Sequence, residues 1–245
     1  KPCLLSRKRN YLYVVTEFIE GQTLTQWMID NPKPDLETVR GIVEQIARGL
    51  QAFHRMEMLH QDLRPANIMI DKTGTVKIID FGSTRVRGVV EAAPSGVRDD
   101  ILGTAQYTAP EYFIGESGST RSDIFSLGVI PYQMLTGRLP YGAEAARIRT
   151  RSDQRNLQYR SALDAQRAIP AWIDEVLRKA LNPNPLKRYE VLSEFVQDLR
   201  QPHPDFLNSR GTPLVEKNPV IFWKCTALLL GIAVIVLLGL LSQRG

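Results

Sequence analysis

Two aspartates and an asparagine lie at a spacing that suits phosphoryl transfer. Asp62 and Asn67 fall within the segment His-Gln-Asp-Leu-Arg-Pro-Ala-Asn at 60–67, and Asp80 follows thirteen residues after Asn67. Phosphoryl transfer from a nucleotide needs one carboxylate to orient the attacking hydroxyl and take its proton, and further oxygen ligands to hold Mg²⁺ against the phosphates. Asp62 suits the first task, and Asn67 and Asp80 suit the second. Because such polar groups are costly to bury without a ligand, we favour this interpretation over a purely structural role.

A β-hairpin is predicted to bring the two metal-binding candidates together. The strand-like runs 68–70 and 76–79 flank a turn-forming segment, Asp-Lys-Thr-Gly, at 71–74. Two short apolar runs around such a turn are typical of a hairpin. The hairpin returns Asn67 and Asp80 to one edge.

Helices are predicted to make up most of the remaining framework. Apolar residues at helical spacing run from the predicted N-cap Asp35 to Phe53, which indicates one amphipathic helix. Gly137 is the expected stop of another helix. Residues 83–108 show no clear periodicity and are expected to form a long functional loop. Further helices are predicted shortly after Gly21 and at 122–136, 171–181 and 189–199.

The motifs around these residues, taken in order, resemble those of protein kinases. The segment 60–67 resembles the catalytic-loop motif H-R-D-L-x-x-x-N, residues 80–82 match D-F-G, and residues 109–111 match A-P-E. Residues 122–129 look like the start of the large central helix of the kinase lower lobe. The match covers roughly residues 10 to 200. It implies an α+β, protein-kinase-like fold, mainly the helical C-lobe with the hinge and the last N-lobe strands.

The resemblance also implies a reaction and the residues that perform it. Mg-ATP is the expected phosphoryl donor, and a serine or threonine hydroxyl of a protein substrate is the expected acceptor. By this resemblance Asp62 is the catalytic base and Arg64 contacts the γ-phosphate, while Asn67 and Asp80 bind Mg²⁺.

The expected nucleotide pocket lies on the other side of the hairpin. The resemblance makes residues 13–21 the hinge, with the backbone groups of Glu17 and Ile19 bonded to adenine and Thr16 as the gatekeeper. Met69 would form the floor of the adenine pocket. Thr104 would order the substrate-facing loop.

Other motif residues are expected to serve the structure rather than the chemistry. His60 and Phe81 are expected to be packing residues, and Asp123 to anchor the backbone of the catalytic loop. Arg188 sits where the family places the partner of the A-P-E glutamate, here Glu111. A buried bridge between these two side chains would support stability rather than catalysis.

The sequence departs from the kinase pattern in several places. Gln61 replaces the motif Arg, so activation is not expected to require phosphorylation of residues 83–108, and Arg64 replaces the usual Lys. No Gly-rich loop and no strand Lys precede the hinge in this sequence, and those parts clamp the phosphates. We therefore expect a fragment that is inactive, or nearly so, when isolated. A pseudokinase scaffold that binds without phosphoryl transfer stays open as an alternative.

Composition places few limits on the partners of the chain. Thirty-one basic and 26 acidic residues give a net charge of +5. This modest excess, partly gathered near the C-terminal apolar run, does not indicate nucleic-acid binding. The two cysteines, Cys3 and Cys225, are not expected to form a disulfide framework, and they fit a reducing, cytosolic compartment.

The last apolar run predicts a membrane-spanning helix. Residues 225–241 carry no charge, and Lys224 is the one charged residue within the longer run 220–241. At about 1.5 Å per residue the longer run spans about 33 Å, enough for a bilayer core. Trp223 suits the interface and Lys224 can reach the headgroups. A buried core helix is the less favoured alternative.

Three segments and a location follow from these patterns. The kinase-like domain is predicted over residues 1–200, a linker over 201–219 and the single membrane helix over 220–241. ATP availability, together with the lysines before the helix, predicts a domain on the cytoplasmic side of a bacterial inner membrane. Segments such as 112–116 and 121–142 resemble bacterial bifunctional serine/threonine kinase/phosphatases. That resemblance implies a phosphatase domain in the same full-length chain, which this lobe would either accompany or regulate.

Overall fold

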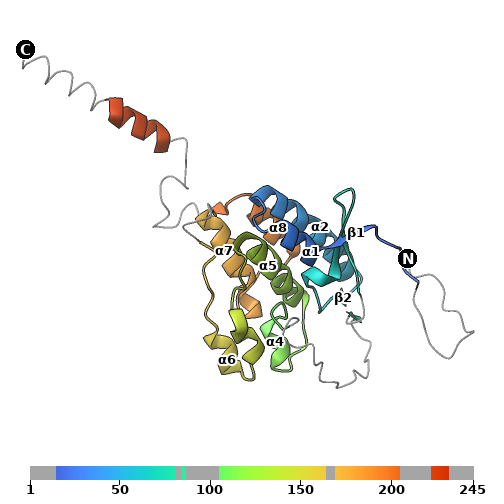
Figure 1. Ribbon diagram of the computed structural model, residues 1–245. Helices are drawn as coiled ribbons and strands as arrows, with labels where there is room; N and C mark the ends of the chain where they lie inside the picture. The colour runs from blue at the N-terminus through green and yellow to red at the C-terminus, as the bar shows by residue number, and fades with distance from the viewer. Residues whose placement is uncertain (1–14, 81–83, 87–104, 164–168, 205–221, 232–245) are drawn as a thin grey trace, which may run out of the picture.

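The computed structural model describes residues 15–80, 84–86, 105–163, 169–204 and 222–231. A body of packed helices carries a small sheet on one side, as Figure 1 shows. The α+β organisation expected from the sequence is therefore confirmed. The start of the predicted hinge, most of the loop at 83–108 and most of the predicted linker lie outside the described residues.

The predicted hairpin is present and forms the centre of a three-stranded antiparallel sheet. Strand β3 (Ile68–Asp71) pairs with β4 (Val76–Ile78) and, on its other edge, with β1 (Gly21–Thr23). Ile68 lies opposite Ile78, and Met69 lies between Thr23 and Lys77. A separate two-stranded ladder joins β2 (Met58–Leu59) to β5 (Arg85–Val86).

Two local features set the register of this sheet. Asp71 closes the hairpin turn, since its side chain accepts hydrogen bonds from the backbone N–H groups of Thr73 and Thr75 at 2.8 and 2.9 Å. Gly74 completes the turn with a positive φ of 83°, which glycine adopts readily. At the other edge, a Cβ on Gly21 would lie 2.1 Å from the Ile70 carbonyl oxygen. Only glycine lets β1 approach β3 this closely.

Helix α2 (Leu36–Arg55) confirms the amphipathic helix predicted after Asp35. The Asp35 side chain caps its first turn by accepting from the Thr38 backbone N–H at 2.9 Å. One face of the helix lies in the core through Val39, Ile42 and further apolar residues. The short helix α1 (Leu24–Asp30) precedes it and packs against β3.

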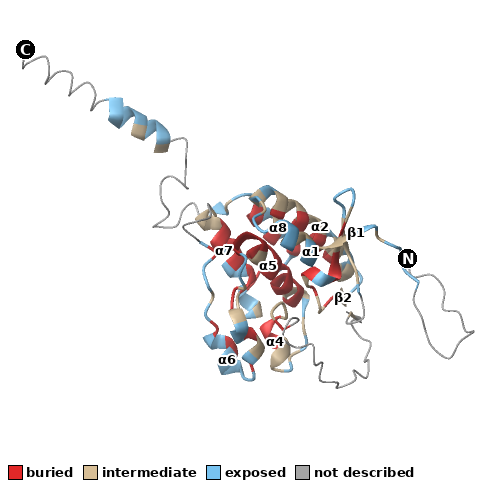
Figure 2. Cartoon of the chain, viewed as in Figure 1, coloured by how far each residue is buried: buried red, intermediate tan, exposed pale blue. Residues whose placement is uncertain are grey.

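Helix α5 (Thr120–Thr136) forms the centre of the body. Fourteen of its seventeen residues are buried, and Figure 2 shows it in red among the surrounding helices. Ser119 begins it with a capping box and Gly137 ends it at φ 70°. The helix starts two residues before Ser122, the predicted first residue, and it ends immediately before Gly137, as predicted. Helix α2 packs along one side of α5 and α7 (Ala171–Ala180) along another.

The last helix of the body starts later than predicted. The sequence indicated a helix over 189–199, but α8 spans Leu192–Arg200. Tyr189 lies before it, buried at 1% exposure, with its ring 5.5 Å from that of Phe195 and its hydroxyl donating to Asp198 at 2.9 Å. Tyr189 therefore mimics helical periodicity because it packs onto the helix without belonging to it.

Short elements connect these helices. They are α4 (Pro110–Phe113), α6 (Arg151–Asn156) and the 3₁₀ turns η1 (Pro65–Asn67), η2 (Gly142–Arg147) and η3 (Pro185–Lys187). Beyond the body, residues 222–231 are helical, and Leu228, Leu229 and Leu230 are 63–67% exposed. Within the part of the chain that the structure describes, no helix is long and apolar enough to span a membrane.

Candidate active site

The predicted base lies in the loop that joins β2 to β3. Asp62 is anchored by Asn67, whose amide nitrogen donates to the Asp62 carbonyl oxygen at 2.8 Å and to its carboxylate at 3.1 Å. Arg64 Nε lies 3.7 Å from the same carboxylate. The Asp62 side chain is 13% exposed and that of Arg64 is 30% exposed. The structure therefore brings these three predicted site residues together and leaves both charged groups accessible.

The backbone is strained on both sides of this site. Gln61 and Asp80 have φ values of 66° and 62°, in the left-handed region that residues other than glycine seldom adopt. The third described residue of this kind, Glu57, ends the turn after α2. Strain of this type costs on the order of 1–3 kcal/mol and persists where the surroundings enforce it. Two of the three strained positions therefore coincide with the candidate site.

Asp123, near the start of α5, anchors the loop between β2 and β3 through its buried carboxylate. Its carboxylate accepts hydrogen bonds from the backbone N–H groups of His60 and Gln61 at 3.0 and 3.1 Å. It also lies 2.9 Å from His54 Nε2. Asp123 is completely buried, so it does not reach a substrate. The prediction that Asp123 anchors the catalytic loop is confirmed.

His60 is a packing residue, as predicted. Its side chain is completely buried, with its ring 5.8 Å from that of Phe53. Burial lowers the pKa of His60, and the carboxylates of Asp123, Asp62 and Asp80 oppose this shift. Asp62 and Asp80 therefore both lie close enough to act on the same imidazole.

The hairpin brings the two metal-binding candidates to the same edge. The Ile79 backbone N–H donates to the Asn67 carbonyl oxygen at 2.8 Å, so Asp80 follows directly beside Asn67. The Asn67 amide nitrogen donates to Asp62 in both of these contacts, and the amide oxygen is the atom of this side chain that can ligate a cation. An amide oxygen and a carboxylate suit Mg²⁺, which takes one or two protein ligands together with phosphate oxygens. The donor set therefore fits this ion.

The residues predicted to contact the nucleotide are partly or fully exposed in this structure. Met69 faces away from Ile68 and Ile70, which point into the core, because side chains alternate along a strand. Met69 is half-buried, as is Ile19. The Glu17 side chain is 69% exposed and pairs with Lys77 at 2.5 Å, which ties residues 15–20 to β4.

Several predicted roles cannot be placed against this geometry. The hydrogen bonds of Glu17 and Ile19 to adenine stay predictions, as does the gatekeeper role of Thr16, an exposed residue. Phe81, Gly82 and Thr104 lie outside the described residues.

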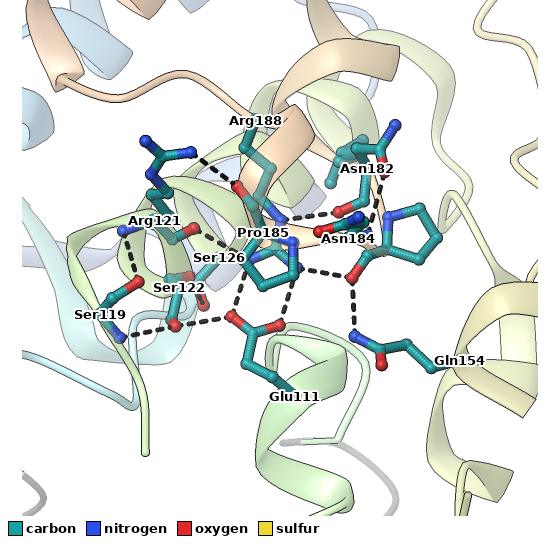
Figure 3. A network of polar contacts seen from close by, with 12 residues as sticks. Glu111, Ser119, Arg121, Ser122, Ser126, Gln154, Asn182, Asn184, Pro185 and Arg188 are labelled. Atoms are coloured by element: carbon teal, nitrogen blue, oxygen red, sulfur yellow. Dashed lines mark hydrogen bonds and ion pairs between the residues drawn. The ribbon is translucent and has the colours of Figure 1, made fainter. Parts of the chain in front are cut away.

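A buried ion pair supports the site from α4 and η3. Figure 3 shows Glu111 facing Arg188, with two parallel hydrogen bonds of 2.8 and 2.7 Å between them. The remaining Arg188 N–H groups donate to the carbonyl oxygens of Asn182, Arg121 and Pro183. Both charged side chains are at most 2% exposed. The predicted structural bridge is confirmed.

Sequence reasoning missed three contacts that position the site. His54 pairs with Asp123 from α2, sixty-nine residues earlier in the chain. Ser122 donates to Glu111 at 2.6 Å. The Tyr107 hydroxyl donates to the side chain of Gln133. No local pattern marks these pairs, because each joins elements that meet only in the folded chain.

Comparisons with known proteins agree with this geometry. The family model described as protein kinase domain matches residues 4–199. The serine/threonine-protein kinase PrkC of Bacillus subtilis is 28% identical over 196 residues, which is 80% of this chain and 30% of that protein. PknB of Mycobacterium leprae is 34% identical over 78% of this chain and 30% of that protein. PknL of Mycobacterium tuberculosis is 33% identical over 72% of this chain and 43% of that protein. The chain spans less than half the length of these relatives.

Proposed function

Because this chain belongs to the protein kinase family, we propose that it forms the helical lobe of a serine/threonine kinase that transfers the γ-phosphate of Mg-ATP to protein hydroxyls. The observation that supports this proposal best is the arrangement around Asp62. Asn67 holds its carboxylate at 3.1 Å, and Asp123 fixes the preceding two residues through their backbone. An accessible carboxylate held this firmly suits a group that must orient a hydroxyl.

Each predicted residue has a task in this proposal. Asp62 accepts the hydrogen bond of the substrate hydroxyl and takes its proton as the new bond to phosphorus forms. Arg64, beside it, binds the phosphoryl oxygens, since a guanidinium is a planar donor suited to phosphate. Asn67 and Asp80 would hold Mg²⁺, which neutralises phosphate charge when bound. Met69 and the backbone of Glu17 and Ile19 would contact the adenine.

We further propose that residues 220–241 anchor the chain in a bacterial inner membrane, with the kinase domain in the cytoplasm. The described part of this segment is helical, and its leucines are exposed rather than packed on the body. Alkaline carbonate extraction of membranes from cells that express the complete gene product should leave it in the pellet. The same protein cut back to residue 204 should be released.

The complete gene product is also proposed to carry a phosphatase domain, while this chain alone is expected to transfer almost no phosphate. A second candidate function is that of a binding scaffold or of a regulator of that phosphatase. The observation that keeps this alternative open is that this sequence shows no strand Lys of the phosphate-clamping type before the hinge.

Transfer of radiolabel from γ-labelled ATP to a protein substrate separates these functions. We expect the complete gene product to transfer label, and Asp62→Asn to lower the rate by at least about a hundredfold, because a positioned base contributes roughly 10²–10⁴ in rate. Glu175→Gln removes an exposed carboxylate on α7 and should change nothing. Equal label from wild type and Asp62→Asn would reject Asp62 as the base. No label from either would favour the scaffold.

A further inference from the structure

A small groove lies beside the candidate site. It has a volume of about 260 Å³ and is bounded by α1, by Pro65 of the catalytic loop, by Tyr107, and by the end of α5. Small-molecule sites usually measure roughly 300–1,000 Å³. The groove is therefore smaller than a typical cofactor pocket, although one large amino-acid side chain would fit in it.

The groove is close to the reacting groups. Pro65 is three residues from Asp62, so their Cα atoms are at most about 11 Å apart, given about 3.8 Å between neighbouring Cα atoms. The charge of Arg64 also acts on the Tyr107 hydroxyl, whose pKa burial raises to about 12. An extended substrate with its hydroxyl at Asp62 would therefore reach the groove within about three or four residues, at roughly 3.3 Å each.

The chemistry of the walls selects the occupant. Met28, Ile29, Pro32 and Met134 provide much of the lining, and none of the described residues that line the groove carries a charge. Ile29 stands at the rim and is 66% exposed. An apolar side chain that enters loses contact with water and gains stability, whereas a Lys or Arg head group would lose hydration without finding a carboxylate.

One polar pair limits what the groove can accept. The Tyr107 hydroxyl donates to the Gln133 side-chain oxygen. The pair is neutral, so it offers no counter-charge to a basic substrate residue. A single isosteric change would convert Gln133 into a carboxylate, and that carboxylate would still accept the bond from Tyr107.

We propose that this groove determines substrate specificity by receiving an apolar side chain that lies within about four residues of the phosphorylated serine or threonine. The inference rests on the proposed function, and it adds the class of protein substrate: sequences with a large aliphatic residue near the acceptor. Ile29 and Gln133 are the specificity-determining residues. Basic residues at the same substrate position are disfavoured.

A position scan of peptides tests the proposal. Each peptide carries one serine and, at one position from four before it to four after it, leucine, alanine or lysine. With the complete gene product, leucine at one or two positions should raise kcat/KM about tenfold over alanine, which is the range that small changes in an apolar pocket produce. Lysine there should fall below alanine. Equal rates for the three residues at every position would overturn the proposal.

Two variants assign the preference to this groove. Gln133→Glu should raise transfer to the lysine peptide and lower transfer to the leucine peptide, reducing their ratio at least tenfold. Ile29→Glu should act in the same direction. Met56→Glu is the matched control, because Met56 is also 66% exposed but lies at the end of α2, away from the groove. A leucine preference unchanged in both groove variants would contradict the proposal.

Peptide binding without ATP distinguishes this inference from the proposed function. The same peptides with a fluorescent label should bind with the leucine preference even to the Asp62→Asn protein. Binding with that preference but no transfer by wild type would reject the kinase activity and keep the groove. Transfer without any preference in binding or in rate would reject the groove and keep the kinase.

Discussion

The molecule contains two networks of charged and polar side chains that differ in their burial and in their hydrogen bonding. Around Arg188, all five guanidinium N–H groups have acceptors, and the charged side chains are at most 2% exposed. Around Asp62, the charged side chains of Asp62 and Arg64 are 13% and 30% exposed, and Arg64 Nε lies 3.7 Å from the Asp62 carboxylate. The first network is saturated and buried, whereas the second is open, in the sense that its charged side chains are partly exposed to solvent. Of the two, the second is therefore the one that a substrate or metal can reach.

The two networks are joined by neighbouring residues on α5. Ser122 donates to Glu111 in the saturated network, and Asp123 accepts from the backbone of His60 and Gln61 in the open one. Adjacent residues of α5 therefore contact both the buried ion pair and the loop that carries Asp62. The difference between the networks indicates that the ion pair determines stability, whereas the loop determines activity.

The largest effect should follow from breaking the saturated network. Arg188→Ala leaves the Glu111 carboxylate buried without its partner, which costs about 3–5 kcal/mol. Arg151→Ala breaks an Arg–Glu pair of similar length, 2.9 Å to Glu116, whose side chains are 78% and 37% exposed. That change should cost less than about 1 kcal/mol. Urea denaturation measures both, and equal losses would contradict the assignment of stability to the buried pair.

Alkaline pH should lower the free energy of unfolding by about 2–3 kcal/mol through the burial of Tyr107, because one pKa unit corresponds to about 1.4 kcal/mol. Burial raises the pKa of Tyr107 to about 12 in the folded chain, against about 10 when unfolded. The folded state therefore keeps a proton that the unfolded state has lost. This contribution is fully present below pH 10 and disappears as pH rises through 12. Between pH 10 and 12 the free energy of unfolding should fall more for wild type than for Tyr107→Phe. Parallel curves of this free energy against pH for the two proteins would contradict the prediction.

A third change tests the link between the networks. Asp123→Asn keeps one acceptor oxygen but places an NH₂ group against a backbone N–H of the loop, leaving a buried donor without a partner. We expect a loss of about 2 kcal/mol, within the range for such donors, together with a fall in kcat. Asp174→Asn, on α7, replaces another buried carboxylate and should lower stability without lowering kcat of the remaining folded protein. A fall in kcat for both would show that α5 has no special role.

The sequence predicted the parts of this arrangement that depend on local signals. Asp35 marked the start of α2, Gly137 marked the end of α5, and the turn at 71–74 marked the hairpin. Each of these signals acts within one or two turns of chain. The predicted start of α8 was wrong because the buried Tyr189 continues the helical spacing of apolar residues, although the backbone at that position is not helical.

The residues of the candidate site could be predicted, but much of their support could not. The motif around Asp62 identified the catalytic candidates, and the family pattern identified the Glu111–Arg188 pair. The contact of His54 with Asp123 depends on how α2 packs against α5. The strained backbone at Gln61 is equally hidden, because glutamine carries no preference for a positive φ.

The smallest effect should come from relieving that strain. Glycine adopts a positive φ without a steric penalty, so Gln61→Gly and Glu57→Gly, at φ 66° and 55°, should each stabilise the chain by up to about 1 kcal/mol. Their activities should differ. Glu57 lies outside the loop, and its change should leave kcat unaltered. Gln61→Gly loosens the backbone next to Asp62, so kcat should fall a few-fold while stability rises. A parallel rise in stability with no change in kcat for either variant would show that the strain at Gln61 does not position the catalytic carboxylate.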